Sequence, residues 1–576
     1  MPGDSVLLNT KSVAQNTYDA IVIGSGISGG WAAKELCDHG IKTLVLERGR
    51  NIEHIKDYPT ATKNSWDFPH RGQLPNSVTK ENPVISRCYA YGEDTEHLFV
   101  KDNEHPYVQE KPFDWIRGYH VGGKSIMWGR ACQRWSDFEF TAPKRYGYAV
   151  EWPIGYADIA PWYSHVEYFA GICGSKDGLE AMPDGDYLPP FEMNCVEKDM
   201  KQRLSAHYKD RFMVHARWAH LTEPRAIHLE QGRGKCQARD LCTRGCPFGG
   251  YFSSVSSTLP WAKKTGNLTI RPFSVVHSII YDEKKGKATG VRIIDTNTKE
   301  TVEYYAKIIF VNAACLNTNL VLLNSTSSRF PNGLGNDSGL LGKYMAFHNY
   351  RGSVYGTVEG YEDKYFFGRN PTSPIIANYR NLHRQDTDFL GGYLTFVGAS
   401  RRAAYTGSDA EGIGAGYKDA ITEPGGWHAG MYMQGETIPK ESNHVKLSKD
   451  LKDPWGIPQL ITSVGYDDND DKLVKDFLTQ SAEMLDVAGV KNLHQHDTKQ
   501  APGLDIHEMG GCRMGKDPKT SLLNKWNQLH HCQNVFVTDG AAMTTTGNQS
   551  PTIFYMAMTA RAANHAVEEL KKQNIL

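Results

Sequence analysis

Three cysteines lie close together near the middle of the chain, in the segment KCQARDLCTRGCPFGG. Five residues separate Cys236 from Cys242, three separate Cys242 from Cys246, and Pro247 follows directly. Such spacing, with a proline that turns the chain away, is typical of iron–sulfur ligation. A zinc site would need a fourth ligand nearby, and a disulfide would leave one thiol over. A loop of reduced thiols without a cluster is the alternative interpretation.

A second group of residues could bind a dinucleotide. Gly24, Gly26 and Gly29 form a G-x-G-x-x-G pattern directly after the apolar run at residues 18–23. The first glycine permits a tight turn, the second lets the backbone approach a pyrophosphate, and the third lets a helix pack on a strand. Glu47 stands 18 residues after Gly29, where a carboxylate accepts hydrogen bonds from ribose hydroxyls. This pattern alone leaves both NAD and FAD open.

A βαβ unit must position these residues. We expect buried strands at residues 18–23 and 44–46, and between them a helix over residues 28–39 whose N-terminal amides face the phosphates. From residue 267 the pattern becomes β. It predicts a meander of three strands, then an apolar strand at 308–311 that returns to the parallel sheet. Further helices are expected at 157–171, 317–323 and 552–571, and strands with aromatic alternation over 350–465.

Length and charge restrict the class of protein. A chain of 576 residues is too long for one core and predicts two or three domains. The 64 basic and 65 acidic residues nearly cancel, so no global field favours nucleic acid or an anionic membrane. No stretch approaches 18 consecutive apolar residues, which argues against a membrane span. The first residues, MPGDSVLLNTKSVAQNTYDA, lack the features of a signal peptide, so we expect the chain to fold in the cytoplasm.

Several spaced segments together resemble the glucose–methanol–choline (GMC) family of flavoprotein oxidoreductases. They are IVIGSGISGG with Glu47, GGKSIMW, WPI, KATGVRIID, HEMGGCRMG, and NVFVTDGAA followed by SPT. The resemblance extends from about residue 17 to residue 568. It implies FAD rather than NAD, and oxidation of an alcohol to a carbonyl. Within the family, the likeness is strongest to pyranose oxidases and to bacterial FAD-dependent glucose or glucoside 3-dehydrogenase catalytic subunits.

The resemblance also implies a fold of the α/β + β class. A Rossmann-like FAD-binding domain would be joined to a second, antiparallel-sheet substrate domain. We assign residues 15–150, 235–345 and 500–576 to a discontinuous FAD-binding domain that includes the cysteine loop 236–250. Residues 151–234 and 346–499 are assigned to the substrate-binding domain.

His507, in GLDIHEMGG, stands where the family has its active-site histidine. Oxidation of a hydroxyl sends a hydride to the flavin N5 and the O–H proton to a base, a role that suits histidine. For the second catalytic position an ungapped match gives Ser550, although Asn548 lies two residues earlier. We favour Asn548, because an amide can donate and accept at once. Ser550 and Gln549 are the alternatives.

The remaining flavin contacts are carried over from the family pattern. They are Gly122, Gly123, Ser125 and Met127 in GGKSIMW, Val276 in the meander, and Asp539 and Gly540 after the last strand. In pyranose oxidases a histidine just before the tryptophan of this segment carries the flavin covalently. Met127 occupies that position here. Since a thioether is a poor nucleophile for such a bond, we expect FAD to be bound non-covalently.

The cysteine segment looks like the one that binds a 3Fe–4S cluster in bacterial FAD-dependent sugar dehydrogenases of the family. The implied function is oxidation of a sugar or glycoside hydroxyl, with the C3 hydroxyl as a candidate, and transfer of single electrons through the cluster to an external acceptor. The alternatives are a soluble pyranose or glycoside oxidase that uses O₂, and a non-enzymatic electron-transfer subunit with a flavin fold.

The same relatives imply partners. They work beside a small hitchhiker subunit that carries the export signal, and pass electrons to an acceptor such as cytochrome c. Gln237 stands where some relatives have an extra cysteine that crosslinks this subunit, so no crosslink is expected. Localisation in the periplasm, after folding in the cytoplasm, would follow from such a partnership.

Overall fold

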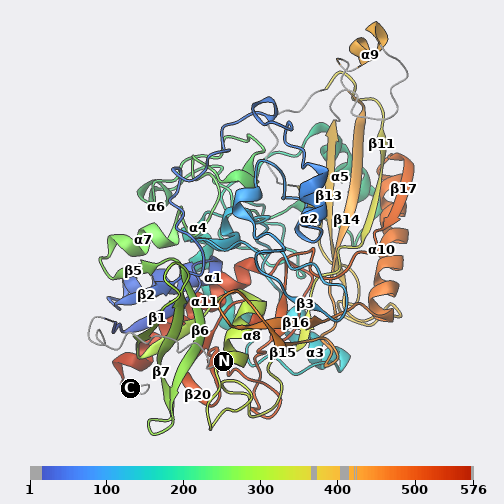
Figure 1. Cartoon of the computed structure of the whole chain (residues 1–576). Coiled ribbons are helices and arrows are strands. Elements are labelled where there is room, and N and C mark those ends of the chain that lie inside the picture. The colour runs from blue at the N-terminus through green and yellow to red at the C-terminus, as the bar shows by residue number, and fades with distance from the viewer. Residues whose placement is uncertain (1–15, 365–372, 402–413, 421, 423–424, 573–576) are drawn as a thin grey trace.

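The computed structural model describes residues 16–364, 373–401, 414–420, 422 and 425–572 (Figure 1). Most of the N-terminal segment in which no signal peptide is expected lies outside these residues. The described strands form four sheets: one mostly parallel, one three-stranded meander and two that are largely antiparallel. The predicted fold class, α/β combined with an antiparallel layer, is confirmed.

The parallel sheet holds the predicted βαβ unit. Its strand order is β19-β20-β9-β1-β2-β5, with β1 at Ala20–Ile23, β2 at Thr43–Leu46, β5 at Leu268–Arg271, β9 at Ile308–Val311, β19 at Gln528–Leu529 and β20 at Cys532–Val537. All four residues of β1 are buried, as expected for a central parallel strand. Helix α1 (Ile27–Asp38) packs against α7 (Thr258–Lys264) and α11 (Thr552–Lys571).

The meander differs from the prediction at its first strand. The run after residue 267 divides into β5, which pairs with β2 at the edge of the parallel sheet, and β6 (Ser274–Asp282). Pro272 has no amide hydrogen, and Phe273 has a φ of +57°, so the strand cannot continue through this pair. Strand β6 then pairs with β7 (Lys287–Asp295), and β7 pairs with β8 (Thr301–Tyr305).

The second layer is a six-stranded antiparallel sheet in the order β17-β11-β14-β13-β12-β4. Its strands are β4 (Met213–His215), β11 (Gly352–Val358), β12 (Pro374–Ile376), β13 (Tyr393–Arg401), β14 (Trp427–Gly435) and β17 (Lys491–Asp497). Helix α10 (Asp468–Val487) lies along its outer side (Figure 1) and contacts β11, β14 and β17. This helix was not predicted from the sequence. The domain bounds themselves stay a prediction.

A smaller sheet, β18-β10-β15-β16-β3, completes the strand layers. It contains β3 (Val108–Gln109), β10 (Lys343–Ala346), β15 (His444–Lys452), β16 (Pro458–Ser463) and β18 (Met509–Gly511). The other helices are α2 (Asn76–Glu81), α3 (Asp137–Tyr146), α4 (Tyr156–Ala170), α5 (Cys195–His207), α6 (Ala226–Glu230), α8 (Cys315–Asn324) and α9 (Ala415–Ala420). None of the helices in the described part of the chain is long and apolar enough to cross a membrane.

Candidate active site

A cavity of about 660 Å³ opens where the carboxyl ends of the parallel strands meet loops from the other sheets. Ligands of open α/β sheets bind at this end of the strands. The cavity brings together most of the residues predicted for the site: Gly24, Gly26, Glu47, Gly123, Ser125, Met127, Val276, His507, Asp539, Gly540 and Ser550. Gly29, Gly122, Asn548 and the three clustered cysteines do not line it.

The three glycines of the fingerprint have different surroundings. A Cβ added to Gly29 would lie 2.0 Å from the carbonyl oxygen of Gly24, so this glycine serves the contact between helix and strand. A Cβ added to Gly26 would meet no atom within 4 Å among the described residues. Gly26 is also the N-cap of α1, and no side chain caps that helix end. The open space and the uncapped amides fit a phosphate group.

Glu47 is held in place by its neighbours. Its carboxylate accepts hydrogen bonds from Ser25 Oγ at 2.5 Å and from the Gly49 amide at 3.0 Å. Burial raises the pKa of Glu47, and these hydrogen bonds oppose that rise. Ser25 Oγ in turn accepts a hydrogen bond from the Gly122 amide at 2.9 Å. Gly122 therefore connects the GGKSIMW segment to the first βα turn, although it does not itself line the cavity.

Two strands along the sheet from β1, Asp539 follows β20 at the same carboxyl end. Its carboxylate accepts hydrogen bonds from Thr318 Oγ1 at 2.5 Å and from the Ala541 amide at 3.0 Å. Burial raises its pKa to about 6. Nearby on the cavity wall, the Tyr555 hydroxyl and the Asn312 amide nitrogen have no hydrogen-bond partner within the described ranges. Such orphaned polar groups fit a polar cofactor in this cavity.

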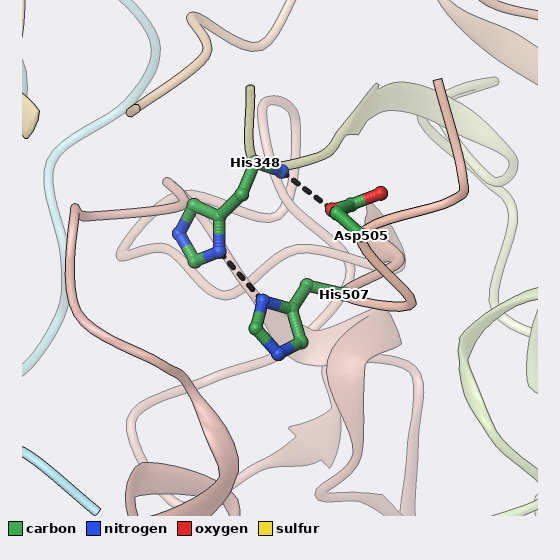
Figure 2. A group of neighbouring side chains, drawn as sticks. All are labelled: His348, Asp505 and His507. Carbon is green, nitrogen blue, oxygen red and sulfur yellow. Dashed lines mark hydrogen bonds between the residues drawn. The ribbon is translucent and has the colours of Figure 1, made fainter. Parts of the chain in front are cut away.

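His507 is paired with a second histidine that the sequence analysis missed (Figure 2). The Nδ1 atoms of His507 and His348 lie 2.8 Å apart, and the His348 amide donates to Asp505 Oδ2, also at 2.8 Å. Burial lowers the pKa of His507 well below its ordinary value, and His348 and Lys124 lower it further. A base that stays neutral at physiological pH therefore stands on the cavity wall. No local pattern marks His348 in the sequence.

The two candidates for the second catalytic position point in different directions. The Asn548 side chain donates to Glu139 Oε1 at 3.2 Å and lies off the cavity. Gln549 donates to the same carboxylate oxygen at 3.1 Å. Ser550 lines the cavity and donates to Gln434 Oε1 at 3.1 Å. This arrangement favours Ser550 over Asn548, because only Ser550 has access to a bound molecule.

Aromatic side chains cover much of the cavity near His507. Phe396 and Tyr432 stack with their ring centroids 4.8 Å apart, and Tyr350 lies 6.2 Å from the His507 ring. Trp128 and Trp218 also line the cavity. Flat aromatic faces suit a ligand whose rings or C–H groups can pack on them.

The three clustered cysteines lie on one loop whose ends meet. The Gly250 amide donates to Cys246 Sγ at 3.3 Å, and a Cβ added to Gly250 would lie 2.9 Å from Cys236 Cα. Burial raises the pKa of Cys236, and raises that of Cys242 to about 12. Among the described residues, ligand atoms within 4.8 Å of one another were found for His348, Asp505 and His507. The three cysteine sulfurs do not form such a group.

Two buried arginines and one buried histidine beside this loop have nitrogen atoms without hydrogen-bond partners among the described residues. Nε and Nη1 of Arg130, Nη2 of Arg233 and both ring nitrogens of His220 lack hydrogen-bond partners in the described part of the chain. Arg130 acts electrostatically on Cys236 and Cys242, and Cys246 acts on Arg233. Buried cations are costly unless an anion accompanies them. An anionic group on the three thiolates fits Arg130 and Arg233, and Arg130 also lines the cavity.

A dinucleotide cradle and a half-buried histidine on one cavity are the features of an oxidoreductase that uses a dinucleotide cofactor. Family models described as GMC oxidoreductase match residues 18–349 and 439–559, and the chain belongs to this family. It is therefore an enzyme that oxidises CH–OH groups, and its cofactor is FAD. The expected resemblance is confirmed, and the NAD and non-enzymatic alternatives are not retained.

Similar proteins match over nearly the whole chain. The 2-methyl-1,2-propanediol dehydrogenase of Mycolicibacterium austroafricanum is 30% identical over 95% of this chain and 94% of its own. The fructose dehydrogenase large subunit of Gluconobacter japonicus is 25% identical over 96% and 98%. A solved structure of an Aspergillus oryzae formate oxidase variant has a TM-score of 0.62 at 13% identity, and covers 97% of this chain and 99% of its own. That last likeness concerns the fold alone.

Proposed function

We propose that this enzyme oxidises a hydroxyl of a sugar or glycoside to a carbonyl, with non-covalently bound FAD and with His507 as the base. FAD, when bound, supplies a two-electron acceptor for the hydride. The aromatic wall formed by Trp128, Trp218, Phe396 and Tyr432 supports a sugar, because flat rings stack on sugar faces. One similar protein is a fructose dehydrogenase subunit. The C3 hydroxyl of a glucoside is the first position to test.

His507 takes the hydroxyl proton in this scheme. Because burial lowers its pKa, the imidazole is neutral and can accept the proton of the hydroxyl oxygen while the hydride leaves the carbon that bears this hydroxyl. The Ser550 hydroxyl donates its hydrogen bond to Gln434 Oε1, so the lone pairs of its oxygen can accept a hydrogen bond from another hydroxyl of the substrate. A polyhydroxylated ring offers a neighbouring hydroxyl of that kind. Ser550 thus replaces Asn548 as our candidate for the second position.

The observation that carries this proposal is the neutral His507 ring on the wall of the FAD cavity. His507→Ala should leave FAD bound and slow flavin reduction in anaerobic single turnover by about 10²- to 10⁴-fold, the usual contribution of a positioned base. Sugars, methyl glucosides and 2-methyl-1,2-propanediol should be compared as reductants. An unchanged rate in the variant would remove His507 from the reaction. Reduction by the diol but by no sugar would assign a small-diol substrate instead.

We propose that Cys236, Cys242 and Cys246 ligate a 3Fe–4S cluster. A cluster of this kind passes electrons one at a time, and the buried arginines Arg130 and Arg233 beside the loop, each with an unpartnered N–H group, support an anionic group there. Aerobic purification with ample iron should give three irons per chain and an odd-electron paramagnetic resonance signal. Cys242→Ser should abolish this signal, whereas Cys195→Ser, outside the loop, should leave it unchanged. Wild-type protein without iron would instead favour an oxidase that passes electrons to O₂.

We also propose that the enzyme works with a small subunit that carries an export signal, and that cytochrome c accepts its electrons in the periplasm. One similar protein is named as the large subunit of a dehydrogenase, which supports a multi-subunit assembly. A tagged chain recovered from its source cells should copurify with a small signal-bearing chain from the periplasmic fraction. Recovery of the tagged chain alone, and only from the cytoplasm, would contradict this proposal.

A further inference from the structure

The hydrogen bonds of His348, the histidine paired with His507, determine which of its ring nitrogens is protonated. His348 Nε2 lies 3.0 Å from the Gly547 carbonyl oxygen and 3.3 Å from that of Thr546. Carbonyl oxygens only accept hydrogen bonds, so His348 Nε2 must carry a proton. Burial lowers the pKa of His348 to about 4, and the ring is therefore neutral at physiological pH. Its single proton is then on Nε2, and its Nδ1 is an acceptor.

This pattern determines where the proton of His507 lies. The two Nδ1 atoms are 2.8 Å apart, which is a hydrogen-bond distance. Since Nδ1 of His348 can only accept, Nδ1 of His507 must donate. The Nε2 atom of His507 is then unprotonated. It lies on the side of the ring away from His348 (Figure 2), and it has no hydrogen-bond partner among the described residues. This atom is free to take a proton from a substrate.

The His348 ring is anchored on both sides. Its backbone amide donates to Asp505 Oδ2 at 2.8 Å, and Asp505 Oδ1 accepts from the Gly503 amide at 3.2 Å. The two imidazole rings stand nearly perpendicular, at 84°. His348, Asp505 and His507 have the composition of a cation site. However, the hydrogen bond already uses the facing Nδ1 atoms, so a proton rather than a cation joins them.

We propose that His348 is a positioning residue that holds His507 as the Nδ1–H tautomer and thereby presents Nε2 as the proton acceptor. The proposal rests on the proposed role of His507 as base. The Ser–His–Asp triad offers a precedent for the size of the effect, because forcing its histidine into the wrong tautomer costs about 10⁴-fold in kcat.

Two substitutions test the role of His348 in the full-length enzyme with FAD bound. His348→Leu removes the acceptor and should slow anaerobic flavin reduction by about 10²- to 10⁴-fold, while the substrate concentration for half-maximal rate changes little. His348→Gln offers an amide oxygen to His507 and an amide N–H to Gly547. It should therefore retain a rate within about tenfold of wild type, the cost of one weakened hydrogen bond.

His228 provides a matched control. It accepts from the Arg225 amide at its Nδ1 and lies beside the Tyr168 carbonyl with its Nε2, but it does not line the cavity. His228→Leu should lower thermal stability as His348→Leu does, and leave flavin reduction at the wild-type rate. The tautomer can also be observed directly in ¹⁵N spectra of histidine-labelled enzyme. The His507 signal is the one that is absent from the His507→Ala spectrum, and it should report a protonated Nδ1 and an unprotonated Nε2. In His348→Leu the same signal should change.

A double-mutant cycle separates this proposal from the proposed function. If His348 acts through His507, His348→Leu should have no further effect on the rate in a His507→Ala background. A slow His507→Ala variant together with a fast His348→Leu variant would overturn the tautomer proposal alone. Equal losses in His348→Gln and His348→Leu would reduce His348 to a structural role. A fast His507→Ala variant would overturn the proposed function itself.

Discussion

Gly26 and Gly29 belong to one motif, yet their surroundings predict opposite effects of the same substitution. Gly26→Ala adds a methyl group where no described atom lies within 4 Å. The backbone there has a φ of −68°, which alanine adopts without strain. The apoprotein should therefore unfold at the wild-type temperature. The methyl group would instead occupy the space into which the pyrophosphate of FAD must come.

The expected loss of FAD affinity in Gly26→Ala follows from the crowding between the added methyl group and the pyrophosphate. Overpacking of this kind costs about 1–3 kcal/mol, which corresponds to roughly 5- to 150-fold weaker binding of FAD. The affinity can be measured by titrating apoprotein with FAD and following the quenching of flavin fluorescence. Calorimetric unfolding of the same apoprotein supplies the stability.

Gly29→Ala is the matched comparison, because its methyl group would lie 2.0 Å from the Gly24 carbonyl oxygen. This variant should destabilise even the apoprotein, since α1 must move away from β1. If Gly26→Ala binds FAD as tightly as wild type, the phosphate does not lie against Gly26 and our interpretation of the cavity is wrong. If both variants lose equal stability without FAD, the different surroundings of the two glycines have no consequence.

Three further predictions concern the site. The rate of flavin reduction should stay constant from pH 8 to pH 6.5 and fall only at lower pH. Burial lowers the pKa of His507, so this base becomes protonated and is lost only in acid. A fall that begins above pH 7 would contradict this prediction. Ser550→Ala should slow flavin reduction more than Asn548→Ala in the same single-turnover assay, and the reverse order would restore Asn548 to the second position. Acid precipitation should release all the flavin, because Met127 stands on the cavity wall where a flavin-carrying histidine would be needed; colour in the pellet would refute non-covalent binding.

The βαβ unit could be predicted from the sequence because its signals are local. The glycines, the apolar run of β1 and the acid at Glu47 all lie within 30 residues of one another. The prediction placed α1 within one residue of its observed bounds. Helix α11 was predicted with the bounds that the structure has. Chain-local patterns of this kind need no knowledge of tertiary contacts.

Other features depend on contacts between distant residues. His348 and His507 are 159 positions apart, and nothing in the sequence around His348 indicates that they meet. The orientation of Asn548 is set by Glu139, which lies 409 positions away. Helix α10 follows directly on the region expected to form strands, residues 350–465, and was not predicted, although Asp467 caps its first turn. The break between β5 and β6 could have been foreseen, since Pro272 interrupts the run.

The order of strands in the parallel sheet has a consequence for biosynthesis. Strand β1, near the start of the chain, pairs with β9, and β9 pairs with β20, which contains residues 532–537. Asp539 and Gly540, which line the cavity together with Gly24, leave the ribosome more than 500 residues after Gly24. Domains generally fold as units as they emerge, but here the cavity lacks Asp539 and Gly540 until β20 has been synthesised. FAD should therefore be loaded after synthesis, and nascent chains truncated before β20 should not retain it.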